Sequence, residues 1–132
     1  SNYFKNRVYL IFACTLLAGL LLCGIIYLPH LSSFILGSFL FLFGLLEGGS
    51  MIAFTLGKEI NYAFVTATVV ALLNSLEGGL NSFTEPLIGK ILDDGASSSL
   101  SATANFHLAL AILPLYIFIA AALILPVKDK NA

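Results

Sequence analysis

Long apolar runs, separated by short polar stretches, dominate the pattern of residues along the chain. Each run is long enough to cross a hydrocarbon core of about 30 Å, which takes about 20 helical residues. Because a helix satisfies its own backbone N–H and C=O groups inside lipid, the pattern predicts transmembrane α-helices. The predicted helices cover residues 8–28, 31–57, 62–92 and 106–125.

The ends of the runs carry residues that interrupt helices. Pro29 follows the first run, and Pro126 follows the fourth. Since only Pro29 and His30 separate the first two runs, those helices should form a tight antiparallel hairpin. The expected arrangement of the four helices as a whole is one of antiparallel hairpins. The stretch from Asp93 to about Asn105 is polar and rich in Ser, and we expect it to be a flexible loop.

The composition supports lipid as the solvent. Of the 132 residues, 59% are apolar and only 10% are charged. Soluble domains are nearer half apolar and a quarter charged, and a soluble chain of this size could not bury so much apolar surface. The chain is therefore predicted to be an all-α membrane protein with a single transmembrane domain. Its net charge of −1 gives no basis for a nucleic-acid partner.

The basic residues predict the orientation of the chain. With four alternating crossings, five of the six basic residues fall on one side of the membrane and only Lys90 falls towards the other. Cytoplasmic loops carry an excess of Lys and Arg, so both termini should be cytoplasmic, and we expect a bacterial inner membrane. The five residues on the cytoplasmic side are Lys5, Arg7, Lys58, Lys128 and Lys130.

The two middle helices carry polar residues where lipid would surround them. Glu47 lies near the middle of the second helix and Glu77 near the middle of the third. A charge at the bilayer centre costs roughly 2.5–3.5 kcal/mol on insertion scales, so these residues should face protein or a watery cavity. At about 100° per residue, one stripe on the third helix contains Thr66, Asn74, Glu77, Asn81, Thr84 and Glu85.

Two interpretations of Glu47 and Glu77 stay open. Protonated, they could form hydrogen bonds between helices, worth about 1 kcal/mol or less each. Facing a cavity, they could bind a cation or exchange a proton during transport. On the second interpretation, Glu47, Glu77, Asn74 and Asn81 are the candidate substrate- or proton-binding residues.

Two prolines lie inside predicted helices. Pro86 frees the carbonyl of Ser82, and Pro114 frees that of Leu110, because proline has no N–H to donate. At Pro86, either a hinge or a static packing bend is consistent with the sequence.

Motifs for catalysis and for cofactors do not occur. The histidines, His30 and His107, lie far apart along the chain, and no His-x-x-His or Cys-x-x-Cys spacing is present. Cys14 and Cys23 are about 13 Å apart along one predicted helix, too far for a disulfide. Neither a nucleophile motif nor a phosphate-binding glycine loop is found, so we expect no enzyme, no cofactor and no metal.

The end of the third helix resembles a known family of transporters. Residues 86–93, Pro-Leu-Ile-Gly-Lys-Ile-Leu-Asp, are similar to the pattern that closes the eleventh helix of major facilitator superfamily transporters. The resemblance implies that the four helices correspond to the ninth through twelfth of that family. It also implies that the second helix lines a central cavity, that the third lies by the interface between halves, and that the outer two are peripheral.

The resemblance leads to one principal hypothesis and two alternatives. A transporter of that family has twelve helices, so we expect a C-terminal fragment of a secondary active transporter for a small solute, with proton coupling through Glu47 or Glu77 as one option. Its partners would be the bilayer, the remaining helices and the solute. The alternatives are a dimeric exporter similar to small multidrug resistance proteins, paired with a second copy, and a four-helix membrane subunit that acts as a scaffold.

Overall fold

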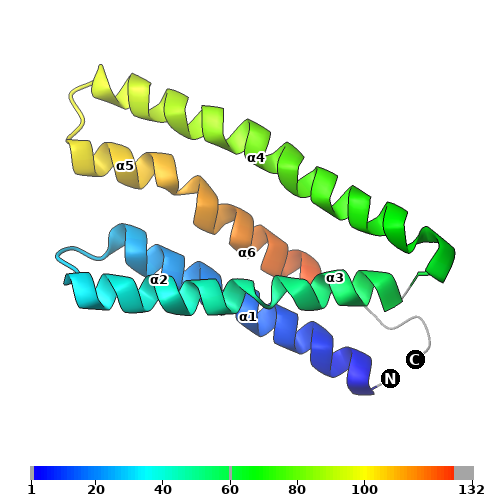
Figure 1. Cartoon of the computed structure of the whole chain (residues 1–132). Helices are drawn as coiled ribbons and strands as arrows, with labels where there is room; N and C mark the ends of the chain where they lie inside the picture. The colour runs from blue at the N-terminus through cyan, green and yellow to red at the C-terminus, as the bar shows by residue number, and fades with distance from the viewer. Residues whose placement is uncertain (1, 60, 127–132) are drawn as a thin grey trace. The chain divides into compact units, whose positions relative to one another are not determined.

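The computed structural model describes residues 2–59 and 61–126, and over these residues it is helical, with no strand. The helices shown in Figure 1 are, in order, α1 (Asn2–Tyr27), α2 (Ser33–Glu47), α3 (Ser50–Glu59), the short 3₁₀ helix η1 (Ala63–Val65), α4 (Thr66–Ala96), α5 (Ala102–Leu110) and α6 (Ile112–Ile124). Joined across short breaks, they form 4 helical stretches long and apolar enough to cross a membrane. The predicted all-α class and the four candidate spans are therefore confirmed. The stretches are Arg7–Tyr27, Ser33–Glu59, Ala63–Ala96 and Ala102–Ile124.

Two of the four spans are broken. The second, predicted as one helix, consists of α2 and α3, which meet at Gly48 and Gly49. The fourth consists of α5 and α6, which meet at Ala111. The second break follows from Pro114, because proline cannot donate to the carbonyl four residues earlier and its ring crowds that turn.

The connection between α4 and α5 is much shorter than predicted. A flexible loop from Asp93 to Asn105 was expected, but α4 continues to Ala96 and α5 begins at Ala102. The cause at the start of α5 is an N-cap, since the Ser101 hydroxyl accepts a hydrogen bond from the backbone N–H of Ala104 at 3.3 Å. The predicted loop was wrong for most of its length, and the fourth span begins earlier than residue 106.

Residues that contact one another divide the chain into two compact units. The first comprises Ser1–Ala53 with Pro114–Ala132, and the second comprises Phe54–Leu113. The chain passes between the two units twice, once within the second span and once within the fourth, and both of these spans are broken.

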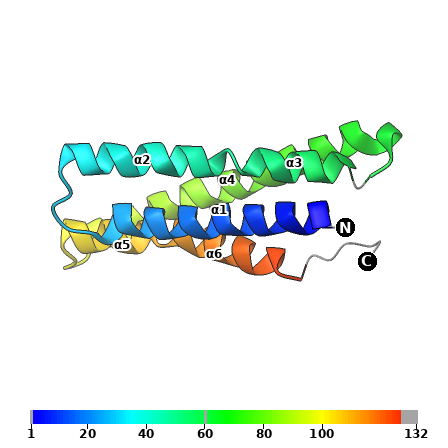
Figure 2. The same ribbon diagram turned by 90° about the horizontal axis from the view of Figure 1, so that it is seen from below.

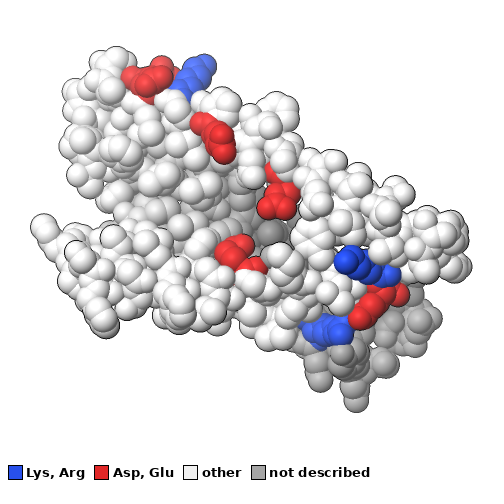
Figure 3. Space-filling view, in the orientation of Figure 1, with Lys and Arg blue, Asp and Glu red and all other residues white. Residues whose placement is uncertain are grey.

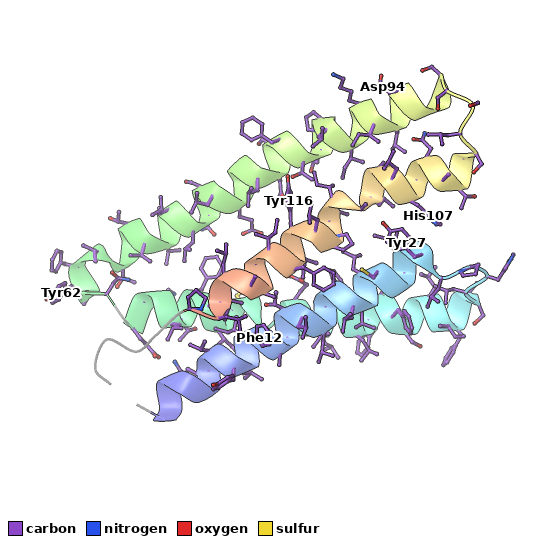
Figure 4. All side chains as sticks on the ribbon, turned by 180° about the vertical axis from the view of Figure 1, so that it is seen from behind. Phe12, Tyr27, Tyr62, Asp94, His107 and Tyr116 are labelled. Carbon is purple, nitrogen blue, oxygen red and sulfur yellow. The ribbon has the colours of Figure 1, made fainter. Side chains whose placement is uncertain are left out.

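In the first unit, α1 contacts both α2 and α6. The ring of Phe39 on α2 covers Gly24 of α1, where an added Cβ would lie 3.1 Å from the ring. A Cβ on Gly19 would likewise lie 3.0 Å from the side chains of Ile117 and Phe118 on α6. Glycine is what permits both close approaches. Figure 2 shows α2 lying along α1, and Figure 4 labels Phe12, Tyr27 and Tyr116 of this unit.

In the second unit, α4 contacts α5 near the turn that joins them. The Asn105 amide of α5 donates a hydrogen bond to the carbonyl of Leu92 on α4 at 2.9 Å. The same amide covers Gly95, where any Cβ would overlap it. Both Gly95 and Asn105 are buried.

Few of the described residues are buried. The buried apolar residues among them are Ile11, Ala18, Ala109 and Ala121. Large apolar side chains instead remain on the surface, such as Phe34, which is 84% exposed, and Phe83, which is 80% exposed. Figure 3 accordingly shows few charged atoms on a largely uncharged surface. Exposed apolar surface on this scale needs lipid or further protein against it.

Candidate functional site

Three polar side chains lie on one face of α4. Asn74, Glu77 and Asn81 are spaced at i, i+3 and i+7 on a continuous helix, so they occupy successive turns of the same face. All three are exposed. Within the described part of the chain, none of them has a hydrogen bond or an ion pair. Their amides and carboxylate are therefore available to a partner or a ligand.

Unlike these three side chains, the hydroxyl groups of Ser82 and Thr84 on α4 form hydrogen bonds. Ser82 donates to the carbonyl of Gly78 at 2.8 Å, and Thr84 donates to that of Leu80 at 2.7 Å. Thr84 is also buried. Such bonds to the preceding turn satisfy a hydroxyl inside its own helix. Thr84, which the sequence placed on the polar stripe, is thus part of the packing.

The position of Gly95 on α4 shows in which direction the polar face of this helix points. Glu77 and Gly95 are eighteen residues apart, which is five full turns of an α-helix. The two residues therefore lie in nearly the same direction around α4, which continues without interruption through Pro86. Because Asn105 of α5 covers Gly95, the polar residues continue the face of α4 that α5 covers. Figure 4 shows the course of α4, from near Tyr62 to Asp94, and His107 on α5.

Glu47 is the last residue of α2 and lies at the break in the second span. After it, backbone hydrogen bonds change from the i−4 to the i−3 pattern: Gly49 donates to Leu46 at 2.9 Å and Met51 donates to Gly48 at 3.2 Å. The Glu47 side chain is exposed. No partner of this carboxylate is found in the described ranges.

The structure brings together three of the four predicted site residues. Asn74, Glu77 and Asn81 share the second unit, whereas Glu47 belongs to the first. A shared site for Glu47 and Glu77 therefore stays a prediction.

The glycines beside the two glutamates pack differently from one another. Gly49 meets α1, where an added Cβ would lie 3.0 Å from the Cβ of Cys14. Gly44, Gly78 and Gly79 have no atom within 4 Å of that position. Of these four, Gly49 alone therefore lies at a close approach between helices.

The contact between Gly95 and Asn105 was missed by sequence analysis, which placed both residues in a loop. The Asn105 Oδ1 atom is buried and has no N–H or O–H donor among the described residues. It lies where a Cβ of Gly95 would stand, so a Cα–H of Gly95 points at it. This arrangement joins two helices and leaves no room for a ligand.

Other features of the described residues offer little chemistry. The described ranges contain no group of three or more His, Cys, Asp or Glu that could hold a metal ion. Cys14 and Cys23 are free, half-buried thiols. An open depression of about 550 Å³ on α2 does not include Glu47 and is lined by Ser33, Phe34, Gly37, Ser38, Phe41 and Leu42.

Comparisons with known proteins add no identification. No family model matches the chain, and neither curated proteins nor solved structures gave a match. The candidate site therefore rests on the positions and chemistry of its own residues.

Proposed function

We propose that the chain is the C-terminal portion of a secondary active transporter for a small solute, with both termini on the cytoplasmic side of the membrane. One observation carries the proposal: Asn74, Glu77 and Asn81 line one face of an apolar helix, exposed and without partners in the described part of the chain. Polar groups at membrane depth are costly unless they meet protein, water or a ligand, and they commonly mark a transport pathway.

The packing of the chain supports antiparallel pairs of spans. Along α1 and α2, Gly24 lies against Phe39 and Cys14 lies against Gly49, so the order of contacts is reversed between the two helices. The exposed apolar surface supports further helices as partners, as does the resemblance of residues 86–93 to the major facilitator superfamily.

Aromatic side chains near the start of α4 support a membrane interface there, and the basic residue beside them supports the proposed orientation. Tyr62 and Phe64 are 77% and 83% exposed, and their rings stack with centroids 5.7 Å apart. Aromatic residues favour the boundary between lipid and water, and Lys58 lies on the same side of the span. This end of α4 therefore suits a cytoplasmic interface.

The chemistry of the polar face favours a solute that donates hydrogen bonds or carries positive charge, or a proton. Glu77 supplies a carboxylate, and the two carboxamides supply both donors and acceptors. No Lys or Arg occurs between Lys58 and Lys90, so the sequence of this span offers no positive charge near Glu77. A cation or a proton would neutralise the carboxylate on this face.

The test uses the full-length gene product in liposomes that contain a trapped pH-sensitive dye, challenged with a panel of amines, amino acids and sugars. Solute-dependent proton movement should fall at least about tenfold in Glu77→Gln, because the amide keeps hydrogen bonding but cannot exchange a proton. Glu85→Gln is the control, because it removes a carboxylate from the same helix at a position that is not among Asn74, Glu77 and Asn81.

A scaffold subunit is the second candidate function. It is favoured by the open face of α2, where Gly37 and Gly44 have no atom within 4 Å of a Cβ and another helix could approach closely. If Glu77→Gln and Glu47→Gln both leave cellular function at the wild-type level, the transporter proposal fails and the scaffold is supported.

A further inference from the structure

Both helical spans that pass from one compact unit to the other are broken. We propose that the breaks at Gly48-Gly49 and at Ala111 are hinges about which the two units move as separate bodies. The proposal concerns the mechanics of the chain and does not depend on what, if anything, is transported.

At the first crossing, the second span changes the helix against which it packs. Gly49 packs on α1, at Cys14. Gly57 packs on α4 instead, where an added Cβ would lie 3.6 Å from both Val69 and Leu73. The helix is interrupted at the start of this interval, where hydrogen bonds of the i−3 type replace the regular ladder. Paired glycines are a known cause of sharp helix kinks, because they restrain the backbone least.

At the second crossing, the fourth span changes its partner in the same way. Asn105 on α5 is bonded to the Leu92 carbonyl of α4. On α6, Ile117 and Phe118 pack against Gly19 of α1. The break at Ala111 falls between these two contacts. Pro114 explains its position, since it leaves the Leu110 carbonyl without its helical donor.

The helices that stay within one unit provide an internal comparison. Helix α4 is continuous for 31 residues, although it contains Pro86 and the pair Gly78-Gly79. That glycine pair follows the same Leu-Glu sequence that precedes Gly48-Gly49. Proline or paired glycine is therefore insufficient to break a helix here. The break occurs where such residues coincide with a change of packing partner.

Hinges of this kind have a direct mechanical consequence. Domain closure is commonly absorbed by a few residues at element ends while packed bodies stay intact. The contacts of Gly19 and of Gly95 lie inside single units and would be preserved during the motion. Glu47 directly precedes the first hinge, so the motion would change the surroundings of its carboxylate.

Distances between pairs of spin labels test the proposal in the full chain, reconstituted in lipid nanodiscs with Cys14 and Cys23 replaced by Ala. The labelled positions are exposed leucines at 51–59%. Leu17 with Leu40 reports on the first unit, Leu76 with Leu108 reports on the second, and Leu40 with Leu108 reports on both together. Pulsed electron paramagnetic resonance should give narrow distance distributions for the first two pairs and, for the third, one that is at least about twofold wider.

Two variants then locate the hinge. Pro114→Ala restores a donor for the Leu110 carbonyl and should narrow the distribution of the third pair. Pro86→Ala, in the unbroken α4, should leave it unchanged. If the distance distribution for Leu40 with Leu108 is as narrow as those of the other two pairs, the proposal is overturned, whatever the variants show. Equal narrowing by Pro86→Ala, or no narrowing by Pro114→Ala, would overturn the hinge at Ala111.

Discussion

Asn105 and Gly95 illustrate how much a single side chain decides in a chain with so small a core. One amide of α5 bonds a backbone carbonyl of α4 and fills the space beside a glycine. The sequence could not reveal this, because a glycine and an asparagine beside a Ser-rich stretch are also typical of a loop. Only the packing of α5 against α4 shows that Gly95 and Asn105 belong to helices and not to a loop.

Gly95→Ala should destabilise the chain by about 1–3 kcal/mol, because the added methyl group overlaps the Asn105 amide. The measurement is the free energy of unfolding in mixed micelles, titrated with SDS. Gly89→Ala is the matched control on α4, since no atom lies within 4 Å of its Cβ position. The double variant Gly95→Ala with Asn105→Ala should lose less stability than the sum of the two single changes. Strict additivity would contradict the described contact.

His30 is the one described residue other than glycine with a positive φ, at 57°. Asn tolerates this left-handed conformation, whereas a β-branched residue is strained in it. His30→Asn should therefore leave the unfolding free energy within about 0.5 kcal/mol of wild type, and His30→Val should lower it by about 1 kcal/mol or more. The same SDS titration gives both values, and equal stability of the two variants would argue against the described turn.

At the scale of the elements, sequence predicts best where the cause is local. The four candidate spans follow from the length of the apolar runs, and Ser32 caps α2 by accepting a hydrogen bond from the backbone N–H of Ile35. The effect of Pro114 is local too, because the missing donor belongs to proline itself. The break at Gly48-Gly49 could not be foreseen, since the identical Leu-Glu-Gly-Gly string at residues 76–79 stays helical. The two strings differ in their packing, because Gly49 lies against Cys14 of α1, whereas Gly78 and Gly79 have no such neighbour.

Ser101→Ala should lower the stability of the chain by about 1 kcal/mol, because α5 loses the hydroxyl that accepts from Ala104. Amide hydrogen exchange in the first turn of α5 should rise at the same time. Ser99→Ala, in the same connection but outside the cap, is the control. Equal effects of the two substitutions would show that the cap does not stabilise α5.

At the scale of the whole molecule, the helical period accounts for part of the candidate site. Asn74, Glu77 and Asn81 share a face because the helix that contains them is continuous, and periodicity alone was enough to group them. The relation of Glu47 to that face depends on how separate helices pack, which no local pattern encodes. Helical periodicity therefore predicts which residues share a face of one helix. Which residues line a complete cavity depends on how separate helices pack together.

The proposed orientation predicts which connections face the outside of the cell. In a chain with Cys14 and Cys23 replaced by Ala, Ser99→Cys should react with a membrane-impermeant maleimide on intact cells. Asn61→Cys should react only after the membrane is permeabilised, because it lies next to the basic end of the second span. Lys128 and Lys130, which support the same orientation, lie outside the described residues. The opposite labelling pattern would reverse the topology.

The division into two units has a consequence for biosynthesis. The second unit is one uninterrupted segment, Phe54–Leu113, so α4 and α5 can associate as soon as both leave the ribosome. The first unit is assembled from both ends of the chain, and Gly19 cannot be covered until Ile117 and Phe118 have been synthesised. During translation, α1 therefore cannot complete its packing until the last helix has been made. A nascent chain arrested before residue 113 would be expected to keep the contact between Asn105 and Gly95 while Gly19 stays uncovered by Ile117 and Phe118.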